Sequence, residues 1–502
     1  MSLKNYRVAL VVDNPYRDLT GLVLVATELC KMGATCYLVP FNLLTKEISY
    51  LLPDFVLLNY QRENIYEATN NKFHSWGIKL GVLDTESISN PIPKHANTLL
   101  QNDEYKGEFP EFDDYFVIMT KDAQARASID CYCCWNESFA NYLIQSKWYI
   151  PSNVYVTGSP RADLFSAKWK ATSIAINPQL NEIKTPMVLI NSNFTLAGPK
   201  FQTDEEEVEM MVKSYNFDRE YMLQWLQIEK QARKEFVDLA NTLSNKFPDI
   251  NFVFRPHPFE DETFYNANLH KNSNLHFIKK GTLDAWLHKS SALIHNKSCT
   301  TSIEAGLAGV PVLTAAWIKV GRSSPILDGI SIEVSSMESM IAHINLIKEN
   351  KLVVSQPIKE RISKIQTELY YKVDGASSER VAQAIINSIQ KSSKTILLKK
   401  AKKEIYAESI SRKDKWTDLI IQIRERMNLS VHFSFSKLKN IYRKQLPWDN
   451  SQKSFSSTQV ENCISAIKNH LNPDLNLKVK LADSKEDYHL GYKEGRSVVI
   501  KN

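Results

Sequence analysis

Two short segments of the sequence place cationic and hydrogen-bonding side chains directly after apolar runs. The first reads FVFRPHP over residues 252–258, so Arg255 precedes a proline and His257 lies between two prolines. Proline fixes the backbone φ angle, and guanidinium and imidazole groups donate hydrogen bonds, so this turn holds two donor side chains on a stiff loop. Folding alone does not require such a pair, and we therefore interpret it as a site for an anion or a developing negative charge.

The second segment reads HNKSCTTSIEAG over residues 295–306 and leads from an apolar run into a helical pattern. Lys297 adds a positive charge, and the hydroxyls of Ser298, Thr300 and Thr301 lie where the helix begins. Unpaired backbone N–H groups at a helix start point towards anions, so this segment predicts a site for a monophosphate or diphosphate. The alternative is that Ser298 or Thr300 caps the helix and binds no ligand.

Carboxylates follow two apolar runs in the first third of the chain. The segment DNPYRDLTG places Arg17 and Asp18 after the first run, and LGVLDTES places Asp84 and Glu86 after a later one. Carboxylates opposite a phosphate-bearing substrate suit a nucleophile or a general base. The alternatives are a helix-capping Asp84 and a salt-bridged Asp18. Three further aspartates are rival candidates for the nucleophile: Asp218, Asp238 and Asp261.

The elements that must position these residues form two successive series of short apolar runs alternating with amphipathic helical patterns. This rhythm is typical of parallel βαβ units. In the first series strands are expected over residues 7–13, 34–40, 54–60, 78–84, 116–121 and 153–157. In the second they are expected over residues 186–194, 251–256, 275–281, 292–296 and 311–316, with a long helix at 219–247 and a closing helix at 378–390.

Two similar α/β series indicate two Rossmann-like domains with a cleft between them, the GT-B type of architecture. We assign residues 1–170 to an N-terminal domain on the acceptor side, 185–390 to a C-terminal domain on the donor side, and 391–502 to a basic, mostly helical extension. Residues 391–415 carry nine basic side chains against three acidic ones, an excess equal to the +6 net charge of the whole chain.

Composition excludes several classes of protein. The chain of 502 residues is 43% hydrophobic and 24% charged, which is ordinary for a globular protein. The seven cysteines lie mostly in apolar segments without metal-ligand spacing, so buried, reduced thiols are expected. The N-terminal apolar run is too short for a signal peptide, and no stretch is long enough to span a bilayer. We therefore expect a cytoplasmic protein.

Four segments, in their order along the chain, carry a family resemblance: TGSPRADLF, VLINSNF, FRPHP and HNKSCTTSIEA. Together they resemble the bacterial surface-carbohydrate biosynthesis proteins. The resemblance extends to the retaining β-Kdo transferases of capsule and O-antigen assembly, and more remotely to GT-B sialyltransferases, whose His-Pro motif holds CMP. It covers about residues 5–390 and implies a glycosyltransferase that uses a CMP-sugar.

The resemblance also implies roles for individual residues. His257 would contact the cytidylate phosphate and Glu304 the ribose hydroxyls, although a solvated helix surface is the alternative for Glu304. The implied donor site comprises Asn191, Asn193, Arg255, His257, Lys297, Ser298, Thr300, Thr301 and Glu304. On the acceptor side, Arg17 would bind the acceptor. Catalysis would fall to Asp18, Asp84 and Glu86.

We expect no cofactor and no metal, the CMP-sugar being a co-substrate. Residues 84–86 read Asp-Thr-Glu, which resembles the metal dyad of the other glycosyltransferase fold. However, two-Rossmann enzymes neutralise leaving-group charge with helix ends and cations, and no further cluster of metal ligands accompanies the dyad. A metal site is therefore not predicted.

The sequence thus predicts transfer of Kdo or a related acidic sugar from a CMP donor to a glycan or lipid-linked glycan of capsule or lipopolysaccharide. The alternatives are a nucleotide-sugar epimerase of the same fold and a non-catalytic glycan-assembly scaffold. Lysines beside the apolar residues 396–398 predict contact of segment 391–426 with an anionic membrane surface, at the inner face of the cytoplasmic membrane. A solvated helix face is the alternative. Nucleic acid is not an expected partner, because no basic stripe interleaves with aromatic residues.

Overall fold

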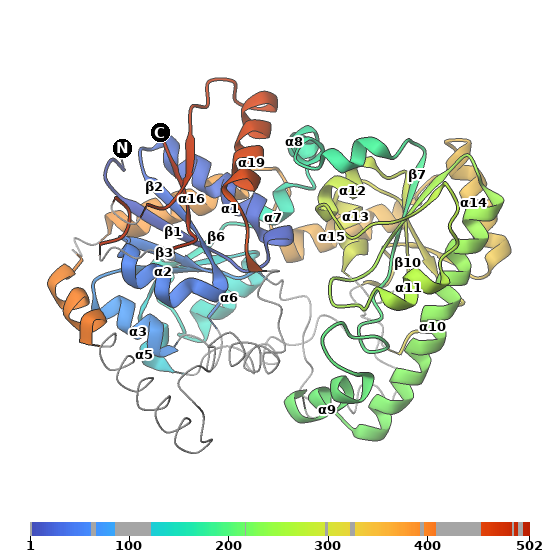
Figure 1. The fold of residues 1–502 in the computed structure, drawn as a ribbon, viewed down its shortest axis with the longest axis horizontal. Coiled ribbons are helices and arrows are strands. Elements are labelled where there is room, and N and C mark those ends of the chain that lie inside the picture. Colours follow the sequence, from blue (N-terminus) through green and yellow to red (C-terminus); the bar gives the residue numbers. More distant parts are fainter. Residues whose placement is uncertain are drawn as a thin grey trace, which may run out of the picture.

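The computed structural model describes residues 3–61, 67–85, 122–215, 217–296, 300–321, 327–391, 396–407, 453–483, 486–489 and 495–502. Several predictions lie outside these residues: Glu86, Lys297, Ser298, the strand at 116–121 and the basic segment beyond residue 407. The described chain forms two lobes, each built on a mainly parallel sheet with helices on both faces (Figure 1). This is the predicted α/β fold with two Rossmann-like domains of the GT-B type.

The sheet of the first lobe has the strand order β13-β14-β2-β1-β3-β4-β5-β6, and β1 to β6 are parallel. These six strands are β1 (Arg7–Val12), β2 (Thr35–Pro40), β3 (Phe55–Leu58), β4 (Lys79–Leu83), β5 (Ile129–Cys134) and β6 (Val154–Val156). The order reverses around β1, which makes the carboxyl ends of β1 and β3 the switch point at which such sheets bind ligands.

Both faces of this sheet are covered, because successive strand side chains point to opposite faces. In β1, Val8 and Leu10 belong to one core, whereas Ala9 and Val11 belong to the other. The first core is covered mainly by α1 (Pro15–Lys31), α16 (Ser377–Gln390) and α19 (Ser457–His470). The second is covered by α2 (Leu44–Leu51), α3 (Glu67–Ser75) and α6 (Glu137–Gln145). Short helices α5 (Ala123–Ala127) and α7 (Pro160–Asp163) complete the lobe, and α8 (Lys170–Ala175) follows.

The sheet of the second lobe has the order β12-β11-β10-β7-β8-β9 and is wholly parallel. Its strands are β7 (Met187–Asn191), β8 (Asn251–Arg255), β9 (Leu275–Phe277), β10 (Ala292–His295), β11 (Val312–Ala315) and β12 (Ile332–Val334). Renumbered from β7, this is the 3-2-1-4-5-6 order of dinucleotide-binding sheets, with its switch point between β7 and β10.

Helices cover both faces of the second sheet as well. One core contains side chains from α10 (Arg219–Lys246), α11 (Thr263–Asn268) and α14 (Met337–Lys348), and the other contains side chains from α12 (Leu283–Lys289) and α13 (Thr301–Leu307). Helix α9 (Asp204–Tyr215) packs against α10, and α15 (Gln356–Tyr370) packs against α13 and contributes Ile365 and Leu369 to the first core. The predicted long helix at 219–247 corresponds to α10.

Helix α16 does not close the second lobe, as the sequence analysis expects, but packs against α1 and β5 of the first. Its apolar side, including Val381 and Ile385, enters the first core, and the Lys79 ammonium donates hydrogen bonds to the carbonyls of Ser388 and Ile389, each at 2.7 Å. An amphipathic pattern predicts that a helix is half-buried, but it does not say on which sheet. The chain therefore crosses between the lobes a second time before residue 377.

The C-terminal extension is part of the first lobe. Strand β14 (Val498–Lys501) pairs antiparallel with β2, and β13 (Lys478–Leu481) pairs antiparallel with β14. The buried carboxylate of Glu47 accepts hydrogen bonds from the Tyr488 and Ser497 hydroxyls, at 2.6 and 2.5 Å. Helix α19 contacts both α1 and α8. The extension thus contains helices, as predicted, together with two strands that the sequence analysis does not foresee.

Two general expectations can be compared with the described residues. The six cysteines there are all buried thiols, as predicted for them. Within those ranges no helix combines enough length and hydropathy to cross a bilayer.

Asp163 in α7 holds the start of α16, where the chain has returned to the first lobe. It is fully buried, and its two carboxylate oxygens accept the backbone N–H groups of Ser377 and Ser378 at 3.0 Å each. Asp163→Ala leaves two buried N–H groups without an acceptor, so we expect a loss of about 2–4 kcal/mol in the free energy of unfolding. Asp163→Asn, which retains one acceptor oxygen, should lose less. Urea denaturation measures both variants.

The matched control is Asp249→Ala, which removes a half-exposed ion pair with Lys348. Exposed pairs contribute less than about 1 kcal/mol, so this variant should unfold almost as the parent does. A similar stability of the Asp163→Ala and Asp249→Ala variants would contradict the capping role.

Candidate functional site

The carboxyl edges of the two sheets meet through a buried ion pair. Arg161 lies in α7, after the last strand of the first sheet, and its guanidinium donates a hydrogen bond to the Glu304 carboxylate in α13. Glu304 is 4% exposed. Burial raises the pKa of Glu304, whereas Arg161 and, more weakly, Arg17 lower it. Glu304 therefore contacts the first lobe. The alternative that it lies on a solvated helix surface is wrong.

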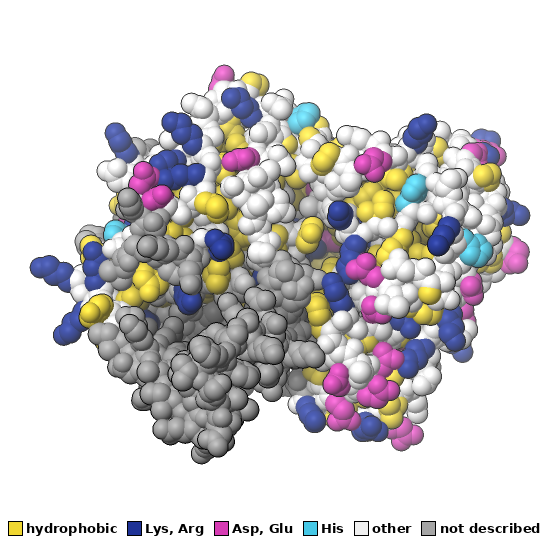
Figure 2. Space-filling view, in the orientation of Figure 1, with side chains coloured by type: hydrophobic (Ala, Val, Ile, Leu, Met, Phe, Trp, Pro, Cys, Tyr) yellow, Lys and Arg dark blue, Asp and Glu magenta, His cyan; other side chains and the backbone are white. Residues whose placement is uncertain are grey.

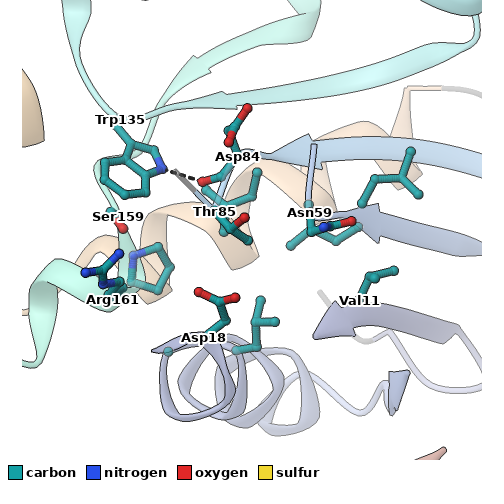
Figure 3. A pocket seen from close by; sticks show the side chains of 14 residues that line it. Val11, Asp18, Asn59, Asp84, Thr85, Trp135, Ser159 and Arg161 are labelled. Atoms are coloured by element: carbon teal, nitrogen blue, oxygen red, sulfur yellow. Dashed lines mark hydrogen bonds between the residues drawn. The ribbon is translucent and has the colours of Figure 1, made fainter. Parts of the chain in front are cut away.

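A pocket lies at the switch point of the first sheet, formed by residues at or just after the carboxyl ends of β1, β3, β4, β5 and β6 (Figure 3). Its polar lining consists of Asp18, Asn59, Asp84, Thr85, Ser159 and Arg161. The remaining lining is mainly apolar and includes Val11, Leu58, Leu83 and Trp135. Because Arg161 belongs both to the pocket and to the ion pair with Glu304, the pocket adjoins the second lobe.

Asp18 and Arg17 form a fixed acidic and basic pair beside this pocket. The Asp18 carboxylate accepts from the Arg17 Nε at 2.8 Å and from the Asn14 backbone N–H at 3.0 Å. Arg17 also contacts the Asp13 carboxylate at 2.9 Å. The salt-bridged Asp18 of the sequence analysis is thus observed, and Figure 3 shows the same carboxylate directed into the pocket. The ion pair with Arg17 fixes the orientation of the Asp18 carboxylate, and in that orientation the carboxylate faces the pocket.

Asp84 contributes its backbone as well as its side chain. Its carbonyl oxygen accepts a hydrogen bond from the Trp135 indole at 2.8 Å, which joins the end of β4 to the end of β5. In Figure 3 its carboxylate lies on the side of the strand end away from Asp18. The two predicted catalytic carboxylates therefore line one pocket but point in different directions.

The Arg-Pro-His-Pro turn of the second lobe is organised by a buried carboxylate, Glu260. This group accepts hydrogen bonds from the His257 backbone N–H at 3.2 Å, from the Ser192 hydroxyl at 2.9 Å and from the Phe194 backbone N–H at 2.9 Å. The Tyr265 hydroxyl also donates to it. Glu260 thereby ties the loop after β7 to the loop after β8. Glu260 is not among the residues predicted from the sequence, because its burial depends on tertiary contacts.

Within this turn His257 carries a neutral imidazole. Burial, assisted by the positive charge of Lys279, lowers its pKa to about 4. The Phe259 backbone N–H donates to Nδ1 at 3.3 Å, so the ring proton lies on Nε2. His257 can therefore donate one uncharged hydrogen bond at pH 7.

Arg255 supports the neighbouring loop. Its guanidinium donates to the carbonyls of Gly281 at 2.8 Å and Lys279 at 3.4 Å, and it lies 5.9 Å from the ring centre of Trp286. Burial lowers its pKa to about 10, opposed by Asp284, so the group is cationic at neutral pH. Arg255 therefore places a positive charge at the carboxyl edge of the second sheet. Its contacts with Lys279 and Gly281 hold the side chain against the loop after β9.

The remaining predicted donor residues surround the β7/β10 switch point. Asn191 ends β7 and is 8% exposed, and its Oδ1 atom has no hydrogen-bond partner in the described residues. Asn193 is half-buried in the loop that follows. Thr300 is the N-cap residue of α13, but its side chain makes no capping hydrogen bond, and Thr301 is buried. Simple capping by Thr300 therefore does not explain these hydroxyls.

The three rival aspartates all lie in the second lobe. Asp218 caps α10 by accepting the Tyr221 backbone N–H at 2.8 Å, and Asp238 is exposed on the same helix. Asp261 accepts from the Thr263 hydroxyl at 3.0 Å. None of them lines the pocket of the first lobe.

Sequence reasoning assigns no role to four residues that the structure brings into the site: Asn59, Thr85, Arg161 and Glu260. Arg161 lies within the quoted segment TGSPRADLF, and Thr85 within LGVLDTES. Asn59 and Thr85 follow buried strands, a position that favours ligand contact in parallel sheets, but many residues share it. In the described residues no group of three or more His, Cys, Asp or Glu side chains is arranged to hold a metal ion.

Comparison with known proteins gives similarity of overall shape alone. A scan against family models and a search of curated proteins give no match. Among solved structures, the UDP-GlcNAc 2-epimerase of Neisseria meningitidis bound to UDP-GlcNAc has 14% identity and a TM-score of 0.44, covering 76% of this chain and 99% of its own. The epimerase of Methanocaldococcus jannaschii has 13% identity and a TM-score of 0.44, with coverages of 76% and 99%. The wall teichoic acid polymerase TagF has 13% identity and a TM-score of 0.45, with coverages of 77% and 90%. At these values the likeness is one of fold alone.

Proposed function

We propose that this protein is a glycosyltransferase that binds a nucleotide-activated sugar between its two lobes. The observation that carries the proposal is the Arg161–Glu304 ion pair, which joins the switch points of two Rossmann-like sheets. Each switch point is a place where parallel sheets bind ligands. A substrate with a nucleotide at one end and a sugar at the other matches two adjoining sites.

The second lobe is the better candidate for the nucleotide. Its strand order is that of dinucleotide-binding sheets, and Asn191 offers a buried acceptor atom at the switch point. The neutral His257 and the hydroxyls of Thr300 and Thr301 are donors suited to phosphate oxygens. Figure 2 shows several Lys and Arg side chains beside the junction of the lobes, and a group of acidic side chains below them over α9. This distribution favours an anionic ligand.

The pocket of the first lobe then receives the sugar or the acceptor. Asp18 directs its carboxylate into this pocket, and Asp84 lines it at the end of β4, so Asp18 is the better placed of the two for a nucleophile or a general base. The family resemblance favours a CMP donor of Kdo or a related acidic sugar, and a surface-glycan acceptor of capsule or lipopolysaccharide. An epimerase of this fold is the second candidate, and it would convert its nucleotide sugar without any acceptor.

A first test concerns the phosphate site. His257→Ala should weaken binding of CMP, or of the preferred nucleotide, by about 1.5–3 kcal/mol, because one hydrogen bond to an ionised phosphate is lost. Since the folded pKa of about 4 leaves the ring neutral, this difference should stay constant between about pH 6 and pH 8. Titration calorimetry measures it.

His276→Gln is the matched control, because this histidine lies in β9 and its Nε2 contacts Asn251 at 2.9 Å. It should bind nucleotide as the parent does. Unchanged affinity in His257→Ala would place the phosphate elsewhere.

A second test concerns the carboxylates. Asp18→Asn and Asp84→Asn should each lower turnover by about a hundredfold or more while nucleotide affinity changes little, because both side chains are proposed to act on the sugar or acceptor. Turnover is assayed with and without acceptor glycan, since acceptor-independent conversion would identify the epimerase. Full activity in both variants would exclude these carboxylates and make Asp261 the next candidate.

The basic segment 397–407, which is helical from residue 398, is proposed to bind an anionic membrane, where a lipid-linked acceptor would reside. Its buried side, with Ala401 and Ile405, packs on the first lobe, and Glu404 accepts from the Trp76 indole at 2.7 Å. Its outer side exposes Leu397, Lys399, Lys403 and Tyr406. This orientation leaves lysines and apolar side chains together towards solvent, which suits contact with an anionic lipid surface.

The membrane proposal predicts that the protein co-sediments with phosphatidylglycerol-containing vesicles at low salt and is released as salt rises. The double variant K399E/K403E should lose more than tenfold in affinity, since each basic residue near the surface contributes about 1 kcal/mol. The control K351E/K364E reverses two exposed lysines of the second lobe and should bind as the parent does. Equal behaviour of the two variants would refute the proposal. Point substitutions are used because removal of the C-terminal extension would also remove α19 and β14 from the core of the first lobe.

A further inference from the structure

The pocket of the first lobe contains two buried polar side chains without hydrogen-bond partners in the described residues. Asn59 follows β3, is 2% exposed, and has neither amide atom paired. Thr85 follows β4, is 9% exposed, and its hydroxyl is also unpaired. Both line the pocket, as Figure 3 shows. Unpaired buried polar groups destabilise a folded protein, so two of them in one pocket indicate a ligand that pairs with them.

The rest of the pocket restricts what that ligand is. Val11, Leu58, Leu83 and Trp135 supply apolar walls beside the two polar groups. A fully hydroxylated sugar would bury hydroxyls against these walls without partners, which is unfavourable. The fitting group therefore combines one donor, one acceptor and a small apolar end. An N-acyl group has this composition: an N–H, a carbonyl oxygen and a methyl.

We infer that the pocket binds the N-acyl group of an acylated amino sugar. The Asn59 Oδ1 atom accepts the acyl N–H, and the Thr85 hydroxyl donates to the acyl carbonyl. The Asn59 Nδ2 atom is then available to a neighbouring ring hydroxyl, and the methyl group packs against Val11, Leu58 and Leu83. This inference rests on the proposed function and names its substrate class. The acylated sugar belongs either to the nucleotide donor or to the acceptor glycan.

Matched ligand pairs test the inference and separate the two sources. The donor pairs are UDP-N-acetylglucosamine with UDP-glucose, and CMP-N-acetylneuraminic acid with CMP-KDN, the nonulosonic acid that carries a hydroxyl in place of the acetamido group. The acceptor pair is methyl N-acetylglucosaminide with methyl glucoside, measured in the presence of CMP or UDP. We expect the acylated member of at least one pair to bind about tenfold or more tightly than its partner, because a site built for hydrogen bonds rejects an analogue that lacks them. The pair that shows the preference identifies the source.

Asn59→Leu should reduce this preference to less than about threefold, and Thr85→Val should reduce it in part. The matched control is Asn70→Leu. Asn70 lies in α3, is fully buried and also has both amide atoms unpaired, but it does not line the pocket. It should keep the preference of the parent. All three variants should melt at or above the temperature of the parent, since each removes an unpaired buried group.

Two outcomes would overturn the inference while leaving the proposed function intact, and a third would refute the proposed function itself. If the protein binds nucleotide sugars but prefers the acylated member in no pair, the inference fails and the proposed function stands. If Asn59→Leu folds and keeps the full preference, the acyl group is recognised elsewhere. Failure to bind any nucleotide or nucleotide sugar would instead refute the proposed function.

Discussion

The buried ion pair between Arg161 and Glu304 is the contact on which the geometry of the site depends. It joins the helix after β6 of one sheet to the helix after β10 of the other, so the carboxyl edges of both sheets face the same space. A buried carboxylate needs a partner, and removing one member of such a pair leaves an uncompensated charge that strongly disfavours the arrangement. The pair therefore links the nucleotide side of the molecule to the pocket of the first lobe.

The path of the chain strengthens this contact. It enters the second lobe after α8, returns to the first with α16, and then adds α19 and β14 to the same core. Asp163 binds the start of α16, and the His288 ring donates to the Leu164 carbonyl at 2.7 Å from the second lobe. The junction is thus held by two chain crossings and by side chains on both sides. A site at this junction needs such support, because its residues come from elements far apart in the sequence.

Two kinds of buried polar group occur around the site, and they differ in function. The Glu260 carboxylate is fully hydrogen-bonded and fixes two loops of the second lobe relative to each other. Asn191, Asn59 and Thr85 are buried with unpaired atoms in the described residues. Satisfied groups stabilise the framework, whereas unsatisfied groups reduce stability in return for recognition of a ligand. This difference in hydrogen bonding distinguishes Glu260, which supports the loops, from Asn191, Asn59 and Thr85, which are proposed to contact substrate.

The sequence by itself indicated the two parallel sheets, because short apolar runs that alternate with helical patterns are typical of buried parallel strands. It also located Asp18, Asp84, Asn191 and Thr300 at strand or helix ends. Tertiary structure decided the rest: α16 joined the first lobe, the C-terminal strands extended its sheet, and Arg161 met Glu304 across 143 residues. The periodicity of apolar residues indicates which side of an element is buried. It does not indicate which other element packs against that side, or which charged residue pairs with another, because both depend on packing between residues far apart in the sequence.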